Sequence, residues 1–178
     1  MKTILVHDKP FRSFISAAAI RQAVLRLAAV MNKELAGKNP IFIAVLNGSF
    51  IFAADLLREM RMDCELSFVK MASYQGDSST GKVKELIGLD REIAGRTIVI
   101  IEDIVDTGIT LDALYTQLNK LNPTEIRTAT LLFKPAAYQK KIKVDYPALE
   151  VPNDFLIGYG LDYNGLGRNL GDIYQAVE

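Results

Sequence analysis

Apolar residues recur at helical spacing in one long segment near the start of the chain. Between residues 16 and 35, Ile20, Val24 and Leu27 repeat every three or four positions, with basic and polar side chains between them. This pattern predicts an amphipathic helix. Gly37 follows it closely and is expected to end it, because glycine readily takes the left-handed backbone conformation that terminates helices.

Short and almost wholly apolar runs follow, separated by polar turns and further helical segments. Such runs are typical of parallel β-strands that are covered on both faces. Strands are predicted at residues 41–46, 66–71, 96–101, 128–133 and 154–160, with helices at 50–60 and 111–118. Strands that alternate with helices predict an α/β fold, with a mostly parallel twisted sheet flanked by helices.

The composition narrows the class of protein. A chain of 178 residues is long enough for one hydrophobic core and short for two, so one domain is expected. Lys plus Arg and Asp plus Glu number 21 each, which gives no overall basic charge for binding nucleic acid. Charged residues interrupt the N-terminal segment, and no apolar run reaches membrane-spanning length, so we expect a cytoplasmic protein without membrane contact.

Polar residues follow three of the predicted strands at the point where each strand ends. They are residues 47–49, residues 102–110 and Lys134. In open α/β sheets, ligands bind beyond the carboxyl ends of the strands. We therefore expect these three segments to meet at one edge of the sheet and to form a binding site.

The segment 102–110 combines a phosphate cradle with carboxylates. A turn that opens a helix leaves backbone N–H groups unpaired, and Gly108 with the hydroxyls of Thr107 and Thr110 suits a phosphate dianion. Three carboxylates precede or join this turn: Glu102, Asp103 and Asp106. They would repel a phosphate unless they face ribose hydroxyls, a divalent cation or a developing positive charge, so a sugar phosphate is the expected ligand. Asp106 taken alone fits a helix cap equally well.

A long polar segment lies between residues 73 and 90 and contains several glycines and serines. Loops of this length are uncommon inside compact domains and often act as lids or binding loops. A plain surface loop or hairpin is the alternative.

Residues 99–110 resemble the diphosphoribose-binding signature of the type I phosphoribosyltransferases: an apolar strand, Glu-Asp, two aliphatic residues, Asp, Thr, Gly and a final Thr. Residues 46–49 resemble the pyrophosphate loop of the hypoxanthine-guanine branch, and residues 73–74 with 79–81 its flexible catalytic loop. Lys134, residues 155–163 and Arg168 resemble its purine-binding hood. The resemblance spans nearly the whole chain. It implies one domain over residues 1–178, with a core at about 35–135 and a small hood from the N-terminal segment and about 136–178.

This resemblance implies an enzyme of purine salvage. Such an enzyme moves the 5-phosphoribosyl group of phosphoribosyl diphosphate to N9 of hypoxanthine or guanine, with Mg2+ as cofactor, as a homodimer or homotetramer. The catalytic residues would be Asp106, acting at the purine N7, with Ser73 and Tyr74. Ribose and 5′-phosphate would bind at Glu102, Asp103, Asp106, Thr107, Gly108, Ile109 and Thr110, and pyrophosphate at Asn47, Gly48 and Arg168. The purine would bind at Lys134, Phe155, Leu156 and Asp162, and Mg2+ at Glu102, Asp103 and Asp162.

Two residues depart from the pattern of this branch, and two other functions stay open. Asn47 stands where relatives often carry lysine or arginine, and Ile109 stands where some relatives carry lysine and bacterial ones vary, so both side chains lack a charge for the anionic donor. A transferase for xanthine, adenine or uracil is one alternative, although the Lys134 donor suits a 6-oxo group. The other is a regulator that senses phosphoribosyl diphosphate and binds nucleic acid. The roughly 40 residues before the first core strand are too few for an added DNA-binding domain.

Overall fold

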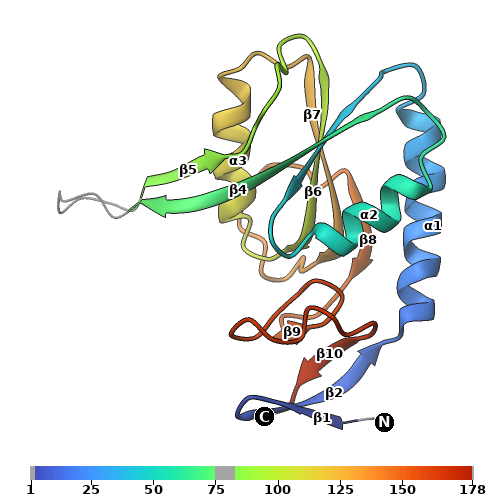
Figure 1. Ribbon diagram of the computed structural model, residues 1–178, viewed down its shortest axis with the longest axis vertical. Coiled ribbons are helices and arrows are strands. Elements are labelled where there is room, and N and C mark those ends of the chain that lie inside the picture. The colour runs from blue at the N-terminus through green and yellow to red at the C-terminus, as the bar shows by residue number, and fades with distance from the viewer. Residues whose placement is uncertain (1–2, 75–82, 178) are drawn as a thin grey trace.

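The computed structural model describes the backbone of residues 3–74 and 83–177 (Figure 1). It describes the side chains of the same residues except 72–74 and 83–86. Within these residues the strands form two sheets. In chain order the elements are β1 (Thr3–Val6), β2 (Lys9–Ile15), α1 (Ala17–Glu34), β3 (Ile41–Val45), α2 (Phe50–Arg58), β4 (Glu65–Tyr74), β5 (Val83–Ile87), β6 (Thr97–Val105), α3 (Ile109–Asn119), β7 (Glu125–Phe133), β8 (Tyr146–Glu150), β9 (Leu156–Ile157) and β10 (Ile173–Ala176).

The larger sheet has the order β5-β4-β3-β6-β7-β8, and all its pairings are parallel except that of β5 with β4. It is covered on both faces, with α3 on one and α1 and α2 on the other (Figure 1). Alternate side chains of β3 lie on opposite faces of the sheet: Phe42 and Ala44 pack with α1 and α2, whereas Ile41 and Ile43 pack with α3. This arrangement confirms the predicted α/β fold.

Helix α1 forms where its apolar spacing predicted. The Ser16 hydroxyl accepts a hydrogen bond from the Ala19 amide at 3.3 Å, which caps the first turn. The buried stripe includes Ile20, Val24 and Met31, which join the core beneath the sheet. In the described residues, no helix is both long and apolar enough to cross a membrane.

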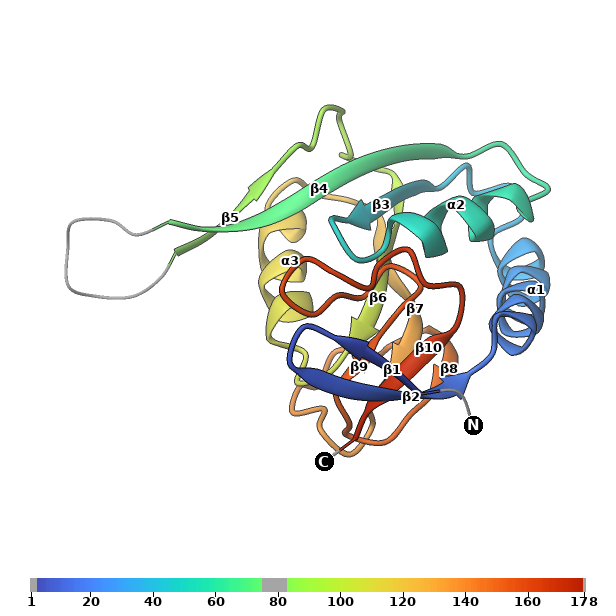
Figure 2. The same cartoon turned by 60° about the horizontal axis from the view of Figure 1, so that its bottom comes forward.

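The smaller sheet, here called the hood sheet, has the order β1-β2-β10-β9 and is antiparallel throughout. It brings the two ends of the chain together in front of the larger sheet (Figure 2). The strand predicted at 154–160 is shorter than expected, since only Leu156–Ile157 is strand. Gly158 (φ +103°) and Tyr159 (φ +49°) take left-handed conformations that turn the backbone out of the sheet.

The boundary between core and hood differs from the expectation. Strand β8 lies inside the stretch 136–178 that was expected to form the hood, yet it pairs with β7 at the edge of the larger sheet. Its short, mixed sequence Tyr-Pro-Ala-Leu-Glu has no continuous apolar run, because an edge strand is only partly covered.

Strand β4 extends to Tyr74, at the start of the polar stretch 73–90, and strand β5 (Val83–Ile87) lies within this stretch. The described parts of β4 and β5 pair antiparallel, with Ser73 opposite Lys84 and Tyr74 opposite Val83. The two flanks of the stretch therefore form the strands of a hairpin, which was the alternative to a lid or binding loop. Residues 75–82, including most of the expected catalytic loop, lie outside the described residues.

The connections of the larger sheet reverse direction between β3 and β6. From β3 the chain passes through α2 to β4 on one side, and from β6 it passes through α3 to β7 on the other. A ligand site is expected at such a switch point, beyond the carboxyl ends of the two strands, because the flanking loops diverge there and leave a crevice.

Candidate active site

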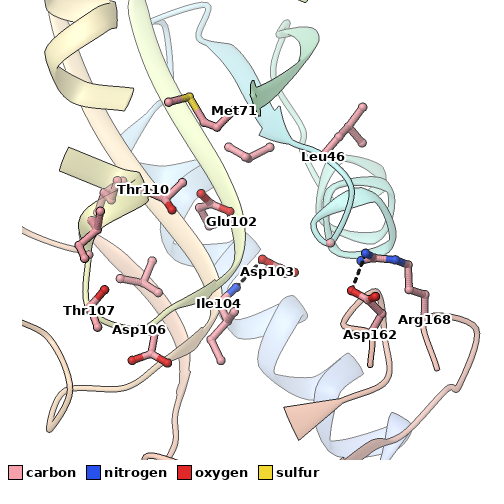
Figure 3. A pocket seen from close by; sticks show the side chains of 16 residues that line it. Leu46, Met71, Glu102, Asp103, Ile104, Asp106, Thr107, Thr110, Asp162 and Arg168 are labelled. Carbon is pink, nitrogen blue, oxygen red and sulfur yellow. Dashed lines mark hydrogen bonds and ion pairs between the residues drawn. The ribbon is translucent and has the colours of Figure 1, made fainter. Parts of the chain in front are cut away.

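A pocket of about 500 Å³ opens at this switch point (Figure 3). Its volume falls in the range of small-molecule sites. Four segments far apart in sequence contribute to it: the end of β3, Met71 of β4, the end of β6 with the start of α3, and the hood loop 158–168. The lining residues are Val45, Leu46, Gly48, Met71, Glu102, Asp103, Ile104, Val105, Asp106, Thr107, Gly108, Ile109, Thr110, Leu111, Asp162 and Arg168.

The turn before α3 forms one side of the pocket. Gly108 has φ +83° and its carbonyl accepts the Asp112 amide at 2.9 Å, so the helix opens directly from this left-handed residue. Only glycine fits, because a Cβ on Gly108 would come within 2.4 Å of the Tyr138 ring. The contact from Tyr138 was not anticipated, and no local sequence signal marks it. Ile109 is 53% exposed and brings no charge.

Two carboxylates at the end of β6 are held in an environment that disfavours their charge. Glu102 is buried, and burial together with neighbouring Asp103 raises its pKa well above the ordinary value. Burial also raises the pKa of Asp103, to about 6, although its Oδ1 accepts the Ile104 amide at 2.8 Å. Nearby Arg168 lowers this pKa and Asp162 raises it. Among the described residues, no side chain donates a hydrogen bond to either carboxylate. A cation or hydroxyl groups of a ligand would relieve both.

The turn after β3 lies against Asp103. A Cβ on Gly48 would stand only 1.5 Å from the Asp103 Oδ2 atom, so the glycine is required for this close approach. The Leu46–Asn47 peptide bond in this turn is cis. On the other side of Gly48, a Cβ on Gly160 would meet the Gly48 carbonyl oxygen at 2.0 Å. The backbone at Gly160, the backbone at Gly48 and the Asp103 side chain therefore pack closely at this wall of the pocket.

The hood loop contributes an ion pair. Arg168 Nη2 lies 2.5 Å from Asp162 Oδ1, and its Nη1 donates to the Gly160 carbonyl at 2.6 Å. Asp162 Oδ2 accepts the Gly165 amide at 2.7 Å. The Arg168–Asp162 pair faces Asp103, while the 106–110 turn lies on the opposite side of the pocket (Figure 3).

Asp106 and Lys134 pair with each other. Lys134 Nζ donates to Asp106 Oδ2 at 2.8 Å, and the lysine side chain is 8% exposed against 42% for the aspartate. Because β6 and β7 are parallel neighbours with Val105 opposite Phe133, the residues that follow the two strands come side by side. The pair thus places a buried cationic donor next to a more accessible acceptor at the mouth of the site.

Several residues expected at the site do not line this pocket. Asn47 is exposed, and its neighbours Leu46 and Gly48 line the pocket instead. Leu156 is buried in the main core. Phe155 is 48% exposed and packs in the hood against Phe11 and Tyr163, with ring centroids 6.2 and 5.7 Å away. Lys134 does not line the pocket either, and its side chain is connected to it through the hydrogen bond to Asp106. The side chains of Ser73 and Tyr74, also expected at the site, are not among the described ones.

A metal ion in this pocket would need ligands from both the protein and the substrate. In the described parts of the chain, no three His, Cys, Asp or Glu side chains converge closely enough to hold a metal ion themselves. Mg2+ commonly takes only one or two carboxylates and fills its other positions with water and substrate phosphates. Asp103 and Asp162 both line the pocket and retain free lone pairs, so this donor set fits such a shared ion.

Comparison with known proteins agrees with this geometry. The family model for the phosphoribosyl transferase domain matches residues 15–164. Hypoxanthine-guanine phosphoribosyltransferase of Streptococcus pneumoniae is 37% identical over 157 residues, which cover 88% of this chain and 87% of that protein. The enzyme of the same name from Mycobacterium tuberculosis is 41% identical over 138 residues, which cover 77% of this chain and 68% of that protein.

Solved structures give the same result. A hypoxanthine-guanine phosphoribosyltransferase from Bacillus anthracis superposes with a TM-score of 0.85 at 32% identity, covering 93% of this chain and 98% of that one. A hypoxanthine phosphoribosyltransferase from Trypanosoma cruzi superposes with a TM-score of 0.85 at 30% identity, covering 93% and 94%. The chain belongs to the phosphoribosyltransferase family and has its type I fold.

Proposed function

We propose that the protein is an enzyme of purine salvage that transfers the 5-phosphoribosyl group of phosphoribosyl diphosphate to N9 of hypoxanthine or guanine. The products are IMP or GMP and pyrophosphate. One observation carries the proposal: the Asp106–Lys134 pair stands beside two buried carboxylates and a phosphate-binding turn at the switch point of the sheet. The names of the relatives point to the same reaction.

The donor would bind across the pocket. The backbone amides and hydroxyls of residues 107–110 suit the 5′-phosphate, since the start of α3 attracts an anion. Glu102 and Asp103 would accept hydrogen bonds from the ribose hydroxyls, which would offset the desolvation that raises both pKa values, since the Ile104 amide already donates to one Asp103 oxygen. Gly48 and Arg168 would hold the diphosphate on the opposite side.

Mg2+ would be held by Asp103 and Asp162 together with the diphosphate, with Glu102 close by. Its chemical contribution when bound would be to neutralise negative charge on the diphosphate leaving group. The need for a cation follows from the charges. Four carboxylates line the pocket, Glu102, Asp103, Asp106 and Asp162, against the single guanidinium of Arg168 among the lining residues. The nearby Lys134 ammonium offsets only Asp106, so a highly charged anion would otherwise be repelled.

The purine would be read by the Asp106–Lys134 pair. N7 and the 6-oxo group are neighbours on one edge of a 6-oxopurine, and the 2.8 Å pair offers an acceptor and a donor side by side. Adenine presents a 6-amino donor, which would leave the buried Lys134 ammonium facing another donor. Phe155, partly exposed in the hood, would stack on the base, and the backbone of Leu156 would contact its edge.

The reaction then needs one proton acceptor. The N9 lone pair attacks C1′ while the C1′–O bond breaks, and pyrophosphate departs with the bonding electrons. The purine is left with an excess proton at N7, which passes to the Asp106 carboxylate. Glu102 and Asp103 lie near the ribose and stabilise the positive charge that develops at C1′. Ser73 and Tyr74 are proposed to assist at the donor from the end of β4.

Two variants test these roles in an Mg2+-dependent assay with hypoxanthine, guanine, xanthine, adenine and uracil. Asp106→Asn keeps an acceptor for Lys134 but cannot take the proton, so kcat should fall by about 10²-fold or more. Lys134→Met removes the donor to the 6-oxo group, so KM for the purine should rise about tenfold while KM for the donor changes little. Wild-type protein that binds phosphoribosyl diphosphate but converts no base would instead support the sensing regulator.

The assembly and the place of action are proposed from the family alone. We propose a homodimer or homotetramer in the cytoplasm that acts on small molecules and binds no nucleic acid. Light scattering coupled to size-exclusion chromatography measures the oligomeric state, and a monomer at micromolar concentration would contradict the proposed homodimer or homotetramer.

A further inference from the structure

The loop 158–168 carries both hood residues that reach the pocket, Asp162 and Arg168. The loop is internally hydrogen-bonded: the Gly160 amide donates to the Arg168 carbonyl at 3.0 Å, and Gly158 and Leu161 bond each other through both of their backbone groups. A loop braced in this way moves as a unit. The position of Asp162 and Arg168 therefore depends on where the loop is fastened to the rest of the molecule.

Tyr159 fastens this loop to helix α2. Its ring is buried in the same core cluster as Phe52 and Leu56 of α2, although the residue belongs to the hood. Its hydroxyl donates to Asp55 Oδ2 at 2.5 Å, a hydrogen bond that spans 104 residues of sequence. Burial and this hydrogen bond raise the pKa of Tyr159, so the phenol stays a donor throughout the neutral and mildly alkaline range.

The backbone of Tyr159 is unusual for its residue type. Its φ is +49°, in the left-handed region that side chains other than glycine, asparagine and aspartate rarely adopt. The flanking glycines allow this turn: a Cβ on Gly158 would come within 2.1 Å of the Asp172 carbonyl oxygen. Such a conformation is maintained only where surrounding contacts offset its cost, and the buried ring with its hydrogen bond supplies them.

Helix α2 is the continuation of the turn that forms the pocket wall. It starts at Phe50, directly after the 46–49 turn, and Ser49 anchors that junction by donating from its hydroxyl to the Val45 carbonyl at 2.6 Å. Gly160, the residue after Tyr159, packs on Gly48 in the same turn. The loop is thus attached at two consecutive residues to one strand-turn-helix unit.

Gly160 in turn controls the ion pair. Its carbonyl accepts Arg168 Nη1 at 2.6 Å, and Nη2 of the same guanidinium holds Asp162 Oδ1 at 2.5 Å. A shift of Gly160 away from Gly48 would carry the whole pair away from Asp103. The hydrogen bond between Tyr159 and Asp55 therefore influences where the Arg168–Asp162 pair lies in the pocket proposed for phosphoribosyl diphosphate.

We propose that Tyr159 and Asp55 form a latch that positions the Arg168–Asp162 pair for the diphosphate and its metal ion. They are positioning residues, because neither touches the pocket itself. The inference rests on the proposed transferase function. It goes beyond that function by assigning a role in donor binding to two residues outside the site.

Four variants separate positioning from simple support of the fold. Tyr159→Phe keeps the buried ring and removes only the hydroxyl. Asp55→Ala removes the acceptor while favouring the helix, and Asp55→Asn keeps an acceptor oxygen. The matched control is Tyr146→Phe, because the Tyr146 hydroxyl also donates to a carboxylate, Glu34 at 3.0 Å, but on edge strand β8 and away from the pocket.

The measurements are kcat/KM for phosphoribosyl diphosphate, the Mg2+ concentration for half-maximal rate, and Tm. Tyr159→Phe and Asp55→Ala should each lower kcat/KM about five- to tenfold and raise the Mg2+ requirement. The double variant should be hardly worse than either single one, because both remove the same hydrogen bond. Asp55→Ala also removes the ion pair with Arg58, but that pair is exposed and 4.0 Å long, so it should contribute little. Asp55→Asn should stay near wild type, and Tyr146→Phe should lower Tm without changing the kinetics.

Two other results would overturn the latch. Tyr159→Phe that loses Tm as Tyr146→Phe does, with unchanged kinetics, would reduce the hydrogen bond to a support of the fold. Losses that add in the Tyr159→Phe, Asp55→Ala double variant would show that the two residues act separately. Wild-type protein inactive on every base would instead refute the proposed function itself, so the two failures are distinguishable.

Discussion

Asp103→Asn replaces a buried carboxylate by an amide of the same shape and is expected to stabilise the ligand-free protein at alkaline pH. Burial raises the Asp103 pKa from 3.8 to about 6. The folded protein therefore holds this proton more tightly than the unfolded chain does. Stability is lost as pH rises from about 4 to above 6, because the folded state must then bear a charge that the unfolded chain accommodates easily.

The size of the effect follows from the pKa. A rise of the Asp103 pKa from 3.8 to about 6 corresponds to at most about 3 kcal/mol of folding free energy, at about 1.36 kcal/mol per pKa unit. Relaxation and water in the open pocket reduce this, so about 1–3 kcal/mol is the working range. For a chain of this length, 1 kcal/mol moves Tm by about 2–4 °C, which gives an increase of roughly 2–12 °C for Asp103→Asn at pH 8.

The assay is thermal unfolding of wild type and variant at pH 8 and pH 4.5 without ligand. Most of the gain should vanish at the lower pH, where Asp103 is already protonated in the folded protein. Asp90→Asn is the control of opposite sign, since hydrogen bonds from Ser67 and Arg91 lower the Asp90 pKa. It should lower Tm by a similar amount at both pH values, because Asp90 stays ionised throughout this window.

Either of two outcomes would refute this reasoning. One is an Asp103→Asn variant that is less stable than wild type at pH 8. The other is a Tm gain that is equally large at pH 4.5, since the gain would then not come from the charge. Asp103→Asn should lower the catalytic activity while it raises the stability of the ligand-free protein. We expect kcat/KM to fall about tenfold or more, because the variant lacks the charge proposed to face the ribose and the metal ion.

Two further changes address packing and capping. Gly48→Ala should lower kcat/KM for the donor by about tenfold or more, because its Cβ would stand 1.5 Å from Asp103 Oδ2; Gly171→Ala, whose Cβ meets nothing closer than 3.9 Å, should leave the kinetics unchanged. Equal activity of the two variants would contradict the close approach. Ser16→Ala removes the cap on the Ala19 amide and should cost about 1 kcal/mol in urea unfolding at unchanged kcat, whereas a stability within error of wild type would show that the cap is dispensable.

The sequence was sufficient for the elements whose signal is local. The spacing of Ile20, Val24 and Leu27 predicted α1, and the apolar runs predicted β3, β4, β6 and β7 at nearly their observed positions. The order of these elements led to the parallel sheet, and the residues after β3, β6 and β7 led to the site. Each inference depends on neighbours within one segment, where periodicity reports directly which face is buried.

The hood sheet was decided only by tertiary structure. Strand β10 pairs with β2 across more than 150 residues. Strand β10 has only four residues, and β2 buries only one of its seven. Nothing in a four-residue segment such as Ile173–Ala176 specifies a partner at the other end of the chain. The pairing forms because it completes a sheet that covers Phe11 and Ile157, a gain that exists only in the folded protein.

The site shows the same division. The sequence by itself determined which groups are available, including the carboxylates of residues 102–106 and the glycines that permit close turns. Only the folded chain brings Gly48 between Asp103 and Gly160, pairs Lys134 with Asp106, and buries Asp103 enough to raise its pKa to about 6. The physical reason is that desolvation and contact depend on every segment packed around a residue, whereas sequence patterns record only the segment to which it belongs.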